Sequence, residues 1–144
     1  MSNFAYQRAR AEVIRGNIDL LADTLKVCLL NSATNLPVDN GVIHYFSEFS
    51  ADVVGTPQTL QNKTISDAAQ LRADPVTFTG LPSVGVMAAV VIYKDTGVAG
   101  TSQVIASYDT SSTYSLFTFP RTLVGQDIKI NWIGNATQNA VLRF

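Results

Sequence analysis

The chain has 144 residues and a net charge of −1, and only 15% of its residues are charged, compared with about 25% in ordinary soluble domains. This length suits a single domain that buries about two thirds of its unfolded surface, so we expect 1–144 to form one unit. The basic residues are mostly scattered, so we expect no nucleic-acid partner. No run approaches the roughly 18 apolar residues of a membrane span, and the first 20 residues lack the pattern of a signal peptide. Synthesis and assembly in a cytoplasm, without a membrane partner, are therefore expected.

The low charge is accompanied by 14 threonines and 11 serines. These residues suit the solvent-facing positions of strands and turns, and they also suit close-packed interfaces. The composition therefore favours a protein whose surface is largely covered by neighbouring copies or by a lattice. The alternative is a monomer with an unusually neutral, threonine-rich exterior.

Residues 5–15 contain no glycine or proline, which predicts a short helix that ends at Gly16. Its apolar stripe is thin, so the helix needs a sheet or a partner to pack against. We assign 1–22 to an N-terminal helix or arm that adds reach and contributes little to the core. Three arginines there are candidate interface residues, although arginines on a short helix usually form its solvated face: Arg8, Arg10 and Arg15.

The segment 24–30 predicts the first strand, with Leu25, Val27 and Leu29 on one face. The only cysteine, Cys28, lies inside this strand on the opposite face. It has no partner for an intrachain disulfide, and we expect it to be a small buried hydrophobic residue.

A long polar connection, 31–41, leads to an aromatic-rich segment, 42–49, which is either a short helix or an irregular loop. The local pattern is irregular and polar on both sides. Three of its aromatic residues are therefore candidate interface anchors, with a satellite core as the alternative: Tyr45, Phe46 and Phe49.

After residue 53 a period of two dominates. Seven apolar residues run from Met87 to Tyr93 and meet a turn at 95–97, and the apolar segment 140–144 is expected to close a sheet. Strands are predicted at 58–60, 64–65, 76–79, 85–93, 103–108, 115–119, 127–133 and 140–144, with a further hairpin turn at 134–135. This spacing predicts a mainly β fold, an antiparallel β-sandwich or partly closed barrel with a short N-terminal helix or arm. Seven residues are assigned to one core: Val27, Leu29, Val90, Ile92, Ile128, Ile130 and Trp132.

The chemical inventory is thin, with one histidine, one cysteine, two glutamates and nine aspartates. A single histidine excludes multi-histidine metal sites. His44 and Glu48 could be two metal ligands or an acid–base pair if their segment is helical, but no third partner is visible, and an interface or core histidine is the commoner case. Three aspartates at strand ends could bind calcium together, although such residues usually cap turns: Asp95, Asp109 and Asp127.

No serine lies in a G-x-S-x-G setting, and no glycine-rich phosphate-binding loop is present. We therefore expect a protein that is not an enzyme, with no catalytic, cofactor-binding or metal-binding residues.

Several segments, taken together and in this order, resemble a family of small structural proteins of tailed bacteriophages: 16–20 (GNIDL), 24–30 (TLKVCLL), 60–67 (LQNKTISD), 74–79 (DPVTFT) and 92–97 (IYKDTG). The resemblance covers nearly the whole chain. It implies a virion component on the capsid exterior, a head decoration or cement protein assembled in the host cytoplasm. Its partners would be the major capsid protein and copies of itself, with a trimer favoured because threefold symmetry suits quasi-threefold capsid sites.

Two alternatives remain open at this point. One is a tail-tube, tail-completion or fibre-attachment component built on the same kind of domain. The other is a carbohydrate-binding module, which needs a planar row of exposed tyrosines or tryptophans. The single tryptophan, in an alternating strand, gives that alternative little support.

Overall fold

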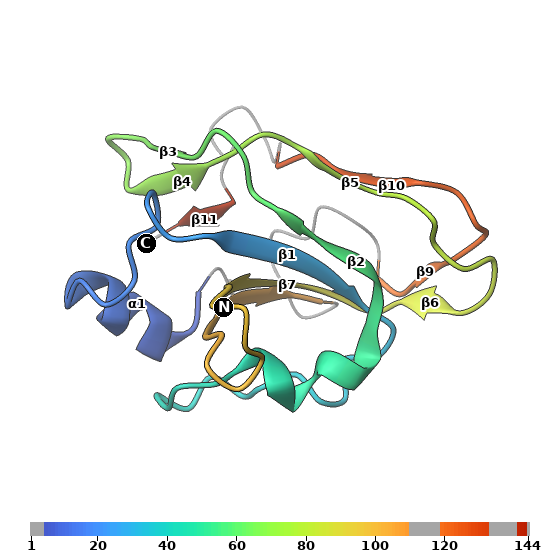
Figure 1. Ribbon diagram of the computed structural model, residues 1–144, viewed down its shortest axis with the longest axis horizontal. Helices are drawn as coiled ribbons and strands as arrows, with labels where there is room; N and C mark the ends of the chain where they lie inside the picture. Colours follow the sequence, from blue (N-terminus) through green and yellow to red (C-terminus); the bar gives the residue numbers. More distant parts are fainter. Residues whose placement is uncertain (1–4, 110–118, 133–140, 144) are drawn as a thin grey trace.

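The computed structural model describes residues 5–109, 119–132 and 141–143. Within them the chain forms one α-helix, α1 (Gln7–Ile14), two 3-10 turns and eleven mostly short strands, arranged as Figure 1 shows. All strand pairs are antiparallel. This confirms the predicted mainly β class with one short helix.

A four-stranded sheet forms the centre of the molecule, in the order β2-β1-β7-β8. Its strands are β1 (Leu25–Leu30), β2 (Val53–Thr59), β7 (Ala89–Lys94) and β8 (Val104–Tyr108). Every residue of β1 except Lys26 is buried, so both faces of this strand are covered. A strand covered on both faces carries a near-continuous apolar sequence, which is why 87–93 lacks an alternating pattern.

Three smaller sheets surround the central one. A ribbon of β5 (Val76–Phe78) and β10 (Ile128–Ile130) lies above it in Figure 1, and the ribbon of β6 (Val86–Met87) and β9 (Arg121–Thr122) forms one end of the molecule. The third sheet contains β3 (Thr64–Ile65), β4 (Gln70–Arg72) and β11 (Leu142–Arg143).

The sequence pattern missed β4 and β9, because strands of two or three residues are too short for alternation to appear. Most of the predicted strand 115–119 and the turn at 134–135 lie outside the described residues. Closure of the sheets into a sandwich or barrel stays a prediction.

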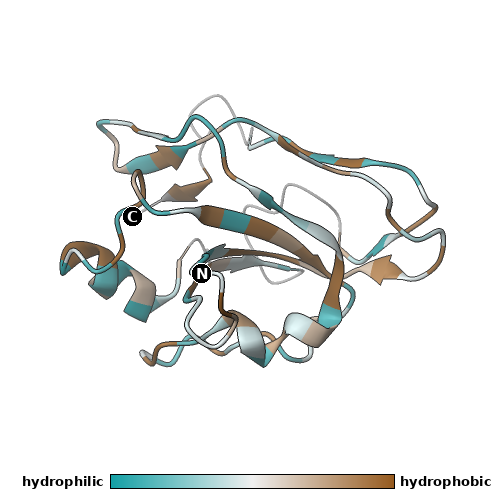
Figure 2. Ribbon diagram, viewed as in Figure 1, coloured by the Kyte–Doolittle hydropathy of each residue, from teal (hydrophilic) through white to brown (hydrophobic). Residues whose placement is uncertain are grey.

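One hydrophobic cluster extends from Tyr6 to Leu142 and contains all seven residues assigned to the core. None of the seven is more than 3% exposed, which confirms that assignment. Figure 2 shows hydrophobic residues along much of β1 and β7. Trp132 is buried, and its Nε1 donates a hydrogen bond to the carbonyl oxygen of Asp74 at 3.1 Å.

The edge strand β2 contains a bulge. The register shift with β1 leaves three residues of β2, 55–57, opposite a single residue of β1. Gly55 has φ +72°, and a Cβ atom there would lie 2.7 Å from Leu81 Cδ2. Pro57, in the same bulge, has no N–H to offer another strand. A bulge and a proline on an edge strand both discourage pairing with a further chain.

Helix α1 packs against the edge of β8. Tyr6 and Ala9 belong to the core, and the backbone N–H of Tyr6 donates to the carbonyl of Ile105 at 2.9 Å. The helix ends before Gly16, which has φ +81°. For residues 5–15 the expectation of an arm that contributes little to the core is therefore wrong, because the apolar side of the helix fills a space beside β8. Residues 1–4 lie outside the described part of the chain.

Candidate interaction surface

Polar residues of two sequence segments, 60–67 and 74–79, meet beside the β5–β10 ribbon. Asn62 adopts φ +51°, and its Nδ2 donates to Asp74 Oδ2 at 2.6 Å. The main-chain oxygen of the same aspartate accepts the hydrogen bond from Trp132. Lys63 Nζ donates to the carbonyl oxygen of Asp23, which precedes β1. These residues therefore hold the outer segments to the central sheet.

The turn after β7 is fixed in a similar way. Asp95 Oδ1 accepts the N–H of Gly97 at 3.0 Å, and its Oδ2 pairs with Lys26 Nζ at 2.8 Å. The hydrogen bond from Lys26 is the main reason that the pKa of Asp95 is lowered. Within the described ranges no group of three or more His, Cys, Asp or Glu could hold a metal ion. The structure thus does not bring Asp95 together with Asp109 and Asp127 as a calcium site.

Cys28 is fully buried in β1. Burial raises the pKa of its thiol to about 12. The thiol therefore stays protonated and unreactive at neutral pH, which agrees with the role of a small packing residue.

The segment 42–49 is a loop that ends in a 3-10 turn, η1 (Phe46–Glu48), followed by η2 (Ser50–Asp52). His44 Nδ1 lies 3.0 Å from Glu48 Oε1, and Glu48 Oε2 accepts the N–H of Tyr45 at 2.6 Å. Burial alone would raise the pKa of Glu48, but the hydrogen bonds from Tyr45 and His44 outweigh it and lower the pKa. The contact between His44 and Glu48 that the sequence suggested is present, and it closes the 3-10 turn.

The three aromatic candidates of this segment have different environments. Phe49 is 1% exposed and belongs to the core. The ring of Phe46 stacks on Tyr93 with centroids 4.4 Å apart and meets Phe49 edge-on at 5.5 Å. Tyr45 is partly exposed. The prediction of Phe49 as an exposed anchor is wrong, because the segment folds back over β7 and buries this ring.

Two of the three candidate arginines are bound within their own helix. Arg8 Nε and Arg15 Nη1 lie 3.0 and 2.8 Å from Glu12 Oε1. Asn17 Nδ2 donates to the other carboxylate oxygen at 2.6 Å, and this hydrogen bond is the largest cause of the lowered pKa of Glu12. Arg10 is partly exposed on the same helix. A contact of the three arginines with a partner stays a prediction.

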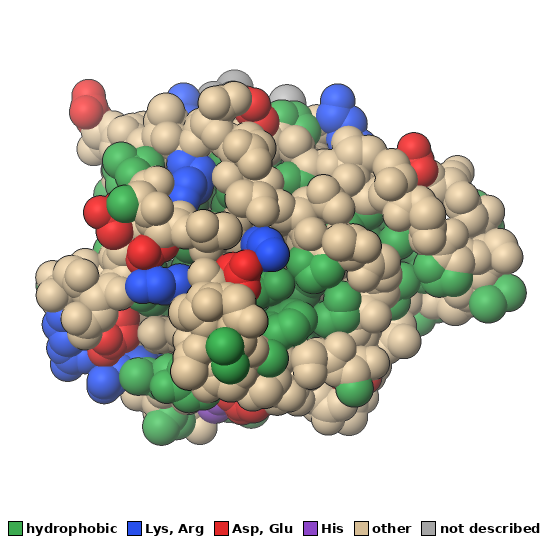
Figure 3. All heavy atoms as spheres, viewed as in Figure 1, with side chains coloured by type: hydrophobic (Ala, Val, Ile, Leu, Met, Phe, Trp, Pro, Cys, Tyr) green, Lys and Arg blue, Asp and Glu red, His purple; other side chains and the backbone are tan. Residues whose placement is uncertain are grey.

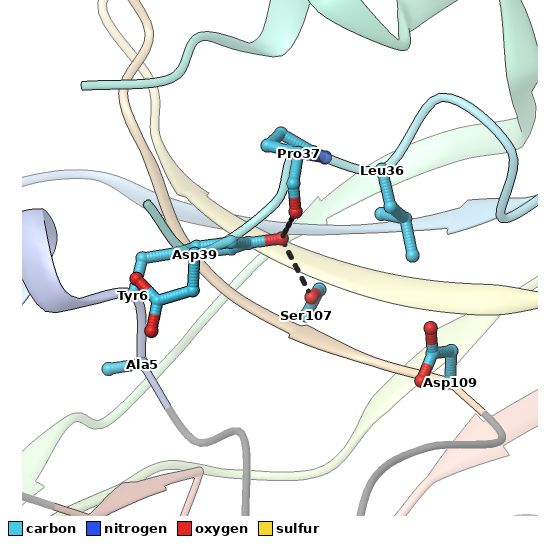
Figure 4. Close-up of a pocket in the computed structure, with 7 residues that line it drawn as sticks. All are labelled: Ala5, Tyr6, Leu36, Pro37, Asp39, Ser107 and Asp109. Atoms are coloured by element: carbon cyan, nitrogen blue, oxygen red, sulfur yellow. Dashed lines mark hydrogen bonds between the residues drawn. The ribbon is translucent and has the colours of Figure 1, made fainter. Parts of the chain in front are cut away.

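A cavity of about 130 Å³ lies beside Tyr6 (Figure 4). The Tyr6 hydroxyl donates to the carbonyl oxygen of Pro37 and also lies within hydrogen-bond distance of Ser107 Oγ, both at 2.9 Å. Burial is the main cause of the raised pKa of Tyr6. Sequence analysis missed this cavity because its walls come from three distant segments: Ala5, Tyr6, Leu36, Pro37, Asp39, Ser107 and Asp109.

An open groove of about 560 Å³ follows β2 and β5. It is lined by Lys26, Thr56, Pro57, Gln58, Thr59, Gln61, Pro75, Val76 and Thr77. None of these side chains is aromatic, so the groove offers no stacking platform of the kind that a carbohydrate-binding module needs. Figure 3 shows that neutral and hydrophobic side chains cover most of this face, with the charged ones in small groups.

Comparison of the sequence with protein-family models and with curated proteins finds no match. Among the described residues, no helix has the length and apolar character needed to cross a membrane. The functional argument therefore depends on the segments and surfaces described above.

Proposed function

We propose that the protein is a structural component of a tailed-bacteriophage virion, a capsid decoration or cement protein. It binds the outer surface of the head and stabilises the contacts between neighbouring capsomers. Its partners are the major capsid protein and copies of itself, with a trimer favoured. The order of the segments that resemble phage structural proteins supports this proposal, and so does the character of the exposed surface. The alternative within the virion is a tail or fibre-attachment component.

The observation that carries the proposal is the pair of apolar protrusions on a charge-poor molecule. Val84 and Val124 are 75% and 59% exposed at the end of the β6–β9 ribbon, where Leu123 N–H donates to the carbonyl of Gly85. Val38 and Val42 are 73% and 53% exposed in the loop that precedes η1. In Figure 1 the ribbon forms one end of the molecule, whereas this loop runs along its lower side.

Two separate apolar protrusions on one folded unit suit a protein that bridges two neighbours. Fully burying a valine contributes about 1.5–3 kcal/mol, so one such contact is modest. Many copies, each with two points of attachment, multiply its effect. Apolar contacts also depend little on salt, in contrast to an interface of exposed ion pairs.

The experiment adds purified protein to undecorated heads at low and high salt and measures bound copies and the temperature of DNA release. We expect binding at both salt concentrations and a higher release temperature for decorated heads. The double variant Val84→Ser/Val124→Ser should bind fewer copies. The matched control is Ile65→Ser, because Ile65 is 50% exposed on β3, away from the ribbon.

Electron cryomicroscopy of complete particles decides between the two virion locations. Density for the protein on the outside of the head would support decoration. Failure of the wild-type protein to bind heads, together with density on the tail, would contradict the proposal and favour the tail alternative.

A further inference from the structure

The loop that carries the wall of the Tyr6 cavity is attached to the rest of the protein by a few polar contacts. The Tyr6 hydroxyl holds the carbonyl of Pro37, and the backbone N–H of Gln7 donates to Asp39 Oδ1 at 2.8 Å. His44 provides the remaining contact. Its Nε2 lies 3.1 Å from the carbonyl oxygen of Val38 and 3.0 Å from Asn40 Oδ1.

Both nitrogens of the His44 ring face oxygen atoms that accept hydrogen bonds. On the Nδ1 side, Glu48 Oε1 lies at 3.0 Å, and the lowered pKa of Glu48 keeps this carboxylate ionised at neutral pH. On the Nε2 side, a carbonyl oxygen can only accept. The orientation of the Asn40 amide is fixed as well, because its Oδ1 accepts the N–H of Val42 at 3.3 Å.

A neutral imidazole has one N–H, whereas the charged ring has two. Only the charged ring can therefore donate to Glu48 and to the loop at the same time. We propose that His44 is a protonation-dependent latch that holds the loop 37–42 against η1 and the N-terminal segment. This inference does not depend on the proposed function.

Loss of the proton acts on one side of the latch more than on the other. A hydrogen bond to a carboxylate is stronger than one to a neutral carbonyl, so the neutral ring keeps its N–H on Nδ1, toward Glu48. The lone pair of Nε2 then faces Val38 and Asn40, and the loop is released. Because Pro37 and Asp39 line the Tyr6 cavity, release also changes the wall of that cavity.

The latch is closed only in the pH window in which Glu48 is ionised and the His44 ring is charged. Raising the pH through the His44 titration opens it on the loop side, and lowering the pH through the Glu48 titration weakens it on the other side. The other titratable groups near the loop are Tyr6, whose ring centroid lies 6.2 Å from that of His44, and the carboxylates of Asp39 and Asp109, which act on Tyr6.

The test is a pH titration of the wild-type protein by nuclear magnetic resonance, with ¹⁵N labelling. His44 is the only histidine, so its ring signals need no assignment. We expect both ring nitrogens to be protonated while the loop is ordered. The amide of Val42 should lose protection against hydrogen exchange by about tenfold as the ring loses its proton, which is the effect of one lost hydrogen bond. The amide of Val91 in β7 is the internal control and should not change.

The variant His44→Gln cannot gain a second donor group by protonation. Its Val42 amide should show the low protection at every pH, so that the pH dependence disappears. The proposal is overturned if the Val42 amide of the wild-type protein keeps its protection through the His44 titration, or if the loop is ordered around a neutral ring that carries its proton on Nε2. The wild-type titration gives this answer even if the variant does not fold.

Discussion

The central strands β1 and β7 and the loop 37–49 are held in place by different interactions. Five of the six residues of each strand are buried, and their register extends from Leu25 opposite Lys94 to Leu30 opposite Ala89. The loop contains exposed residues such as Val38 and Asn40, and His44 and Glu48 fix its course through hydrogen bonds. The strands should therefore respond to changes in side-chain volume, and the loop to changes in protonation. Attachment to a partner can then be adjusted in the loop without loss of the fold.

The largest effect is expected from a change in the core, on the side of the comparison that depends on volume. Trp132→Ala removes a buried ring and should lower the free energy of unfolding by about 3–5 kcal/mol. Trp132→Phe, which keeps much of the apolar volume, is the matched control and should cost less. Urea unfolding followed by circular dichroism measures both variants. An unchanged midpoint for Trp132→Ala would contradict the burial of this side chain.

A smaller effect is expected at the β2 bulge, where backbone conformation and packing act together. Gly55→Ala should cost about 2–3 kcal/mol, because the residue has positive φ and its Cβ meets Leu81. Gly80→Ala is the matched control. Gly80 has φ +65° with nothing within 4 Å of a Cβ, so only strain of about 1 kcal/mol is expected. The difference between the two unfolding free energies isolates the contact with Leu81, and equal values would show that Leu81 moves aside without cost.

The smallest of these effects concerns the charge network of α1, which resembles the loop in its dependence on protonation. The pKa of Glu12 is lowered in the folded protein by the hydrogen bond from Asn17 and by its two arginines. Its ionised form therefore stabilises the fold above the unfolded pKa, and this contribution is lost as the pH falls through the folded pKa. Unfolding between about pH 7 and about pH 3, the range that spans carboxylate titration, should show a steeper loss of stability for the wild type than for Glu12→Gln. Identical pH profiles would show that Glu12 contributes no such linkage.

Much of the fold could be predicted from local patterns. The alternation in 127–133 and the apolar run from Met87 to Tyr93 predicted buried strands, and the structure places β10 and β7 there. The helix and its end at Gly16 followed from composition and from the conformational freedom of glycine. These elements were predictable because burial imposes a period on the sequence of a strand.

The candidate surface was predictable only in part. The spacing of His44 and Glu48 allowed their contact, but nothing in the sequence indicated Val38 and Asn40 as the partners of the second ring nitrogen. The aromatic character of 42–49 was evident, yet the same character fits a core residue and an exposed anchor. Phe49 is buried because the loop returns over Tyr93, which lies 44 residues later in the chain.

The sequence by itself determined which segments are apolar enough to form the core, and therefore the mainly β class and the central strands. The tertiary structure alone decided which side chains meet. It brought together Tyr6, Pro37 and Ser107 around one cavity, and it packed α1 on β8 where the sequence had suggested a free arm. The physical reason is that burial leaves a periodic signal within each segment, whereas a hydrogen bond between distant residues depends on how the whole chain folds and leaves no local signal.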